Sequence, residues 1–91
     1  EQADGALLGA EFIHVMPNPN DGSFILRIDT DFQRGSVTML DHQGKRVGQE
    51  TRVQQGSNAM DYQHLAPGYY TVRIDLDGAT QVQRILVIQA K

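Results

Sequence analysis

Three serines directly follow a glycine, a position in which some hydrolases carry their nucleophile. They are Ser23, Ser36 and Ser57. None lies in a Gly-x-Ser-x-Gly segment between a strand and a helix, which is the context that exposes such a nucleophile. Each falls instead where a strand is predicted to begin or a turn to end. We therefore expect no catalytic residues, and no other motif in the chain predicts an enzyme.

Metal binding is the second chemistry to consider. His14, His42 and His64 are far apart and lack the paired spacing typical of metal ligands. The chain has no cysteine, which removes both thiolate metal sites and disulfides. We therefore predict no metal site at the histidines, and no bound cofactor.

Oxygen-bearing side chains are denser in one short stretch of the chain. A turn explains them most simply, because the alternating spacing and the closing glutamate of a full calcium loop are missing. A calcium ion bound at this stretch remains the alternative. The residues concerned are Asn18, Asn20, Asp21, Asp29 and Asp31.

Length and charge narrow the class of protein. The 91 residues suffice for one domain. With 8 basic and 11 acidic residues, the net charge of −3 argues against binding to nucleic acid or to an anionic membrane surface. The longest apolar run, Ile85–Ile88, is far shorter than the roughly 20 residues of a membrane span. The start of the chain does not resemble a signal peptide, so we expect any export signal to precede it.

Apolar residues at every second position predict strands rather than helices. The alternation is clearest at Phe24, Leu26 and Ile28, and again from Tyr70 to Leu76. About seven short strands, separated by turns, predict an all-β antiparallel sandwich. The predicted strands are 12–16, 24–29, 36–40, 45–53 (kinked at Gly48), 58–62, 69–76 and 81–88.

Turn residues separate these strands. Asp41–Gly44 predicts a hairpin with a bulge, and Asp77-Gly78 predicts a two-residue hairpin. Gln54–Ser57 is predicted as a further turn. Two proline corners, Pro17–Gly22 and Leu65–Gly68, complete the set. Residues 1–11 are predicted to be a linker, and 12–91 the folded domain.

The same corners and turns carry a resemblance to a known family. Pro17-Asn18-Pro19-Asn20-Asp21-Gly22 resembles the Pro-x-Pro-x-x-Gly signature of the C-terminal sorting domains of the type IX secretion system. The family's later motifs follow in order over Phe12–Lys91, with Met16 in place of its usual aromatic residue and Arg84 in place of its usual lysine. The residues that match are Pro17, Pro19, Gly22, Gly44, Lys45, Leu65, Gly68, Tyr70, Arg84, Ile85, Val87 and Lys91.

The resemblance implies a seven-stranded immunoglobulin-like sandwich that serves as a noncatalytic secretion signal. It implies a passenger N-terminal to the chain, which the type IX translocon carries from the periplasm across the outer membrane of a Gram-negative bacterium. A sortase-like cysteine protease then usually removes the domain, and the passenger reaches the cell surface or the medium. The small residues Gly5, Ala6, Gly9 and Ala10 correspond to the cleavage region.

An extracellular fibronectin-like or carbohydrate-binding module is the alternative function. It would use Tyr62, Tyr69 and Tyr70 to stack on sugar rings. The pattern favours a core position for Tyr70, with its hydroxyl bonded to the backbone as in a tyrosine corner, and an outward position for Tyr69.

Under the sorting interpretation, the last strand lies at a sheet edge, where a partner could add a strand beside Arg84 and Lys91.

Overall fold

Alternating apolar side chains form strands whose buried faces meet in a single core. The computed structural model describes residues 9–62 and 64–88. A 3-10 turn, η1 (Ala10–Phe12), precedes the first strand. The strands are β1 (Ile13–Met16), β2 (Ser23–Ile28), β3 (Gly35–Leu40), β4 (Arg46–Arg52), β5 (Gly56–Asp61), β6 (Gly68–Leu76) and β7 (Ala79–Val87).

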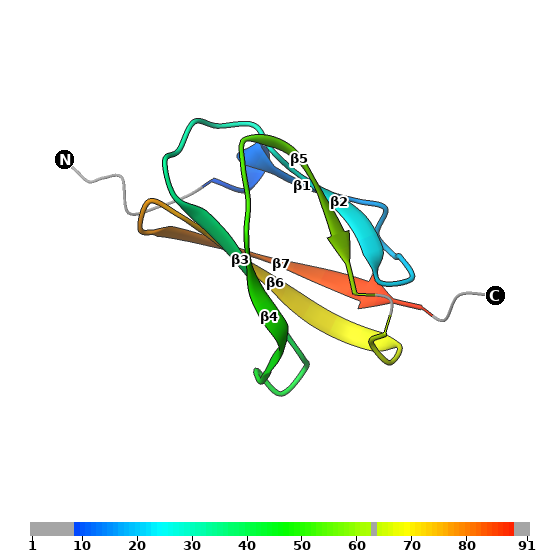
Figure 1. The fold of residues 1–91 in the computed structure, drawn as a ribbon. Helices are drawn as coiled ribbons and strands as arrows, with labels where there is room; N and C mark the ends of the chain where they lie inside the picture. Colours follow the sequence, from blue (N-terminus) through cyan, green and yellow to red (C-terminus); the bar gives the residue numbers. More distant parts are fainter. Residues whose placement is uncertain (1–8, 63, 89–91) are drawn as a thin grey trace.

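The strands form two antiparallel sheets packed face to face (Figure 1). One sheet has the order β1-β2-β5, and the other has the order β4-β3-β6-β7. The chain crosses between the sheets after β4, so β5 pairs with β2 rather than with β4. The predicted immunoglobulin-like β-sandwich is confirmed. Within the described part of the chain, no helix is long and apolar enough to span a membrane.

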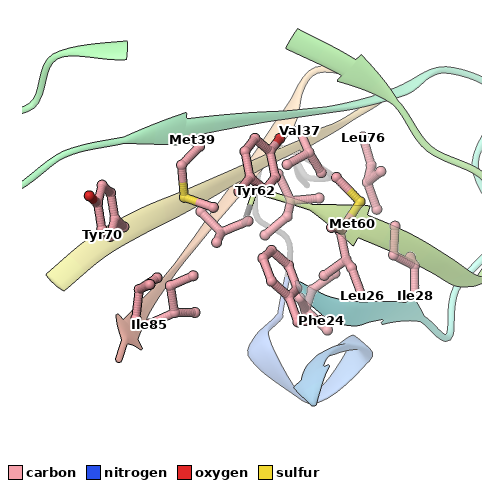
Figure 2. Close-up of a cluster of buried hydrophobic side chains, with 14 residues drawn as sticks. Phe24, Leu26, Ile28, Val37, Met39, Met60, Tyr62, Tyr70, Leu76 and Ile85 are labelled. Atoms are coloured by element: carbon pink, nitrogen blue, oxygen red, sulfur yellow. The ribbon is translucent and has the colours of Figure 1, made fainter. Parts of the chain in front are cut away.

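The core lies between the two sheets and contains side chains from both. Phe24 of β2 stacks on Tyr62, with ring centroids 6.1 Å apart and ring planes 15° apart (Figure 2). Aromatic and branched side chains bury large apolar areas in such a layer and supply most of its stability. Side chains with no exposed surface are Leu26, Ile28, Val37, Met39, Val72 and Ile74.

Most strand boundaries differ from the predicted ones by one or two residues, and the physical reason is clear at three of them. Phe12 belongs to η1 because its N–H donates to the carbonyl of Gly9, at 3.3 Å. The predicted turn Gln54–Ser57 is too long, since Gly56 already pairs with β2. The last strand begins at Ala79 rather than Gln81, because Ala79 pairs with Leu76 across the predicted two-residue hairpin.

The predicted kink in the fourth strand is confirmed as a change of register. Met39 of β3 pairs with Val47, whereas Val37 pairs with Thr51. The extra residues of β4 around Gly48 bulge out of the ladder, which bends the strand locally.

Tyr62 and Tyr70 provide a matched test of the core. The hydroxyl of Tyr70 donates to the carbonyl of Ala66 at 2.6 Å, as the predicted tyrosine corner requires. The buried hydroxyl of Tyr62 has no hydrogen-bond partner within residues 9–62 and 64–88.

We expect Tyr70→Phe to lower the free energy of unfolding by about 1 kcal/mol. Tyr62→Phe should leave it unchanged or raise it. Urea unfolding of both variants measures the difference, and equal losses would contradict the assignment.

Candidate functional site

Motif residues from four separate stretches lie at one end of the sandwich. At this end β3 passes into β4, since Leu40 pairs with Arg46 and also with Thr71 of β6. Thr71 in turn pairs with Arg84, near the end of β7. We call this end the motif end (Figure 1). Its motif residues are Pro17, Pro19, Gly22, Gly44, Lys45, Leu65, Gly68, Tyr70, Arg84, Ile85 and Val87, while Lys91 lies outside the described residues.

The chain enters the sandwich at the opposite end. Ile13, the first residue of β1, pairs with Ile28 at the far end of β2, and β1 then runs toward the corner. Of the predicted cleavage region, Gly9 and Ala10 lie at the start of the described chain, beside and within η1. Gly5 and Ala6 fall outside the described residues.

The corner Pro17–Gly22 connects the two sheets. Before it, β1 pairs with β2 in the three-stranded sheet. Within it, Asn20 forms a parallel bridge to Val87 of the four-stranded sheet. Both peptide bonds preceding the prolines are cis. The prolines supply no backbone donor, so the pairing in this stretch depends on the residues between and after them.

Asn20 is the buried polar side chain of the described core, with 3% of its surface exposed. Its amide donates to the carbonyl of Pro17 at 3.0 Å and accepts from the N–H of Gly22 at 2.8 Å. Its backbone N–H donates to the carbonyl of Leu86 at 3.0 Å, and its backbone carbonyl accepts from the N–H of Ile88 at 2.7 Å. A buried amide is tolerated because its polar groups are satisfied in this way.

Asn18 also binds β7, through its side chain. Its amide oxygen accepts from the N–H of Leu86 at 3.0 Å, and its nitrogen donates to the carbonyl of Arg84 at 3.3 Å. The corner therefore occupies the outer edge of β7 from the carbonyl of Arg84 to the N–H of Ile88. β7 is an edge strand as predicted, but this part of its edge is already paired.

The second motif is the β3–β4 turn, whose shape depends on Asp41. Gly44 adopts a φ of 83°, which a residue with a side chain reaches only with strain. The carboxylate of Asp41 accepts from the N–H groups of Lys45 and Gln43, each at 2.9 Å. These bonds, that of Lys45 foremost, hold the pKa of Asp41 below its ordinary value. The side chain of Lys45 itself is exposed.

The second corner, Leu65–Gly68, leads into β6, whose first residue Gly68 pairs with Val87 at the end of β7. Leu65 is half-buried and packs against the core. Tyr70 pairs with Ile85, and both side chains are buried. Four motif residues, Gly22, Tyr70, Ile85 and Val87, are buried and therefore build the domain rather than contact another molecule. The motif residues with exposed side chains are Pro17, Pro19, Lys45 and Arg84.

Four of the five side chains that could have formed a calcium loop have oxygens that contact other groups of the protein, and the fifth, Asp31, is exposed. The oxygens of Asn18 and Asn20 accept the backbone bonds described above, and one oxygen of Asp21 accepts from the N–H of Ser23 at 3.0 Å. Asp29 contacts His14 and Arg27, each at 3.2 Å. No cluster of three or more metal-binding side chains occurs among the residues that the structure describes.

The three tyrosines do not form the exposed stacking surface that sugar binding would require. Tyr62 and Tyr70 are buried, with 5% and 8% of their surface exposed. Tyr69 is exposed, but it lies under the guanidinium of Arg84, 5.9 Å from the ring centroid. A flat platform of three tyrosines is therefore not formed.

Two of the asparagines and one aspartate have roles that the sequence analysis did not assign. Asn18 and Asn20 connect the corner to β7, and Asp77 accepts from the N–H groups of Gln33 and Arg34 at 2.8–3.2 Å. Asp77 thereby fixes the β2–β3 loop against the β6–β7 hairpin. Asparagine and aspartate within turns were the available signal, but sequence does not show which distant backbone they bind.

Comparison with known proteins identifies one family. The family model described as "Secretion system C-terminal sorting domain" matches residues 14–89. That match includes both corners, the β3–β4 turn and all of β7. No curated protein matches the chain.

Variants of Asn20 distinguish a structural role of the corner from a role in cation binding. In Asn20→Asp a carboxylate oxygen replaces the nitrogen that donates to Pro17, so two acceptors face each other in a buried site. We expect the free energy of unfolding to fall by about 2–3 kcal/mol, with a similar loss for Asn20→Ala. Urea unfolding with and without millimolar calcium measures this. A calcium-dependent gain in the stability of Asn20→Asp would show instead that the corner binds cations.

Proposed function

Since the chain belongs to the type IX secretion C-terminal sorting domains, we propose that it directs an N-terminal passenger across the outer membrane and is then removed. Membership of this family makes the domain a secretion sorting signal, which is a noncatalytic class. The finer proposal has three parts. The translocon binds the folded domain in the periplasm, a sortase-like cysteine protease cleaves before η1, and the passenger is attached to the cell surface.

The observation that carries the proposal is the separation of the two ends of the sandwich. The motif residues gather at one end, and the chain enters at the other. A passenger joined before η1 would therefore leave the motif end accessible. This geometry suits a signal that a large receptor reads while the passenger is still attached.

The exposed motif residues are the natural contacts for the translocon. Pro17 and Pro19 form a rigid surface beside β7, and Lys45 and Arg84 add two positive charges. We assign receptor contact to these four and a scaffold role to the buried ones. Deleting residues 84–91 would not test this cleanly, because Ile85 and Val87 are 1% and 2% exposed and belong to the core.

The position of η1 supports cleavage upstream of it. Phe12 accepts a backbone hydrogen bond from Asp29 at 2.8 Å, which ties η1 to the sandwich. Proteases cut most readily where the backbone is not held by such bonds. Within the predicted region, we therefore disfavour cleavage at Gly9 and Ala10, because the carbonyl of Gly9 accepts from the N–H of Phe12 and Ala10 lies within η1.

A reporter fusion tests the proposal. The reporter carries an ordinary export signal at its N-terminus and this chain at its C-terminus, in a host with the type IX system. We expect the reporter on the cell surface or in the medium, without the domain. Immunoblots of each fraction and mass spectrometry of the reporter's new C-terminus measure both steps.

The control is the same host without the translocon, in which the intact fusion should remain in the periplasm. Equal export from both hosts would overturn the sorting function. Export of an uncleaved fusion would overturn only the proposed removal.

A further inference from the structure

The outer edge of β7 is divided into a paired part and an open part. Backbone groups of successive residues in a strand point to alternate sides. Those of Leu86 and Ile88 point away from β6, toward the corner. By this alternation the backbone groups of Thr80, Val82 and Arg84 point to the same side. No described strand lies beside β7 there, so the edge from Thr80 to the N–H of Arg84 is open to strand addition.

Three arginines lie on the outer face of the four-stranded sheet: Arg84 and Arg73 lie beside this open edge, and Arg46 lies on β4 at the opposite edge. Val82 pairs with Arg73, so the two lie side by side on that face. Arg84 pairs with Thr71, which is opposite Leu40, and Leu40 is opposite Arg46. The three arginines therefore occupy two neighbouring rows of the sheet.

The positive charge of these rows is available to a partner. Arg46 and Arg84 form no salt bridge with any described residue, and Arg84 is held over the ring of Tyr69. Arg73 contacts Asp75 at 3.3 Å, with about half of its side chain exposed. An exposed pair of this kind contributes little and can be exchanged for another carboxylate. The domain as a whole carries a charge of −3, so the basic surface is a local feature.

We propose that the edge Thr80–Arg84 binds an extended, acidic segment of the receptor, which adds as a strand to β7 and places carboxylates against Arg84 and Arg73. This inference rests on the proposed sorting function and names the chemistry of the partner. Alternate side chains of an added strand recur about every 7 Å, which is also the separation of Val82 from Arg84 along β7. The corner, by occupying the edge beyond Arg84, fixes where the added strand must end.

The open backbone edge favours a protein partner over an anionic polysaccharide or lipid. A polypeptide can satisfy the exposed N–H and C=O groups of Thr80 and Val82 in register, as in known cases of strand addition. A polysaccharide would meet the arginines but leave that backbone pattern unused. Val82 is 54% exposed and offers an apolar contact between the charged positions.

Point variants of the reporter fusion test the site in cells. Val82→Pro removes the outward N–H at a position where an edge strand tolerates proline, and Val82→Ala keeps it. Arg84→Glu reverses the charge at the edge, and Arg27→Glu makes the same change on β2 of the other sheet. We expect Val82→Pro and Arg84→Glu to reduce export about tenfold or more, and both controls to stay within about twofold of the unchanged fusion.

Urea unfolding confirms that each variant is folded before export is compared. Normal export of the unchanged fusion together with normal export of Val82→Pro and Arg84→Glu overturns this inference and leaves the sorting function intact. Failure of the unchanged fusion to be exported overturns the sorting function, on which this inference rests.

A direct binding measurement distinguishes the kinds of partner. The probe is the peptide acetyl-Asp-Val-Asp-Val-Asp-amide, and its control replaces each Asp with Lys. We expect the acidic probe to shift the backbone amide NMR signals of Thr80, Val82 and Arg84, with shifts that shrink at high salt. Shifts confined to another edge, equal shifts from both peptides, or shifts caused only by an anionic polysaccharide such as polygalacturonate would overturn the proposal.

Discussion

The fold depends on how one buried amide ties the β1–β2 connection to the other sheet. After β1, the chain reaches β7 of the four-stranded sheet within the corner and then returns to the three-stranded sheet as β2. Asn20 makes this bridge possible, because its side chain closes the corner while its backbone pairs with Leu86 and Ile88. A side chain unable to form these bonds would leave polar backbone groups buried without partners, which costs more than any single surface contact gains.

Local chemistry made much of this fold predictable. Period-two alternation identified the strands, and the turn residues of Asp41–Gly44 and Asp77-Gly78 identified two hairpins, because each signal acts over a few neighbouring residues. The boundaries at Phe12, Gly56 and Ala79 were less accurate, because pairing with distant strands decides them. The bond of Tyr70 to Ala66 was predictable since it spans one corner.

The family resemblance supplied the residues of the candidate site, and their arrangement in space could not be predicted from it. The resemblance identified the prolines of the corner and the apolar end of β7 as parts of one signature. It did not reveal that the corner binds β7, because Asn18 and Leu86 are 68 residues apart and only the folded sandwich brings them together. For the same reason, oxygen-bearing side chains of the corner suggested ligands for a cation, whereas their partners are backbone groups.

The burial of the motif residues bears on what kind of signal this is. Tyr70, Ile85 and Val87 are buried, so a receptor cannot read them as a linear sequence. Their contribution is to position exposed groups, such as Pro19 and Arg84, that come from opposite ends of the sequence. Since β7 carries one of these groups and the corner bound to it carries the other, the arrangement exists only after both sheets have formed. Under the function proposed above, such a sorting signal would be a property of the folded domain, because unfolding separates its exposed groups even though every motif residue is still present.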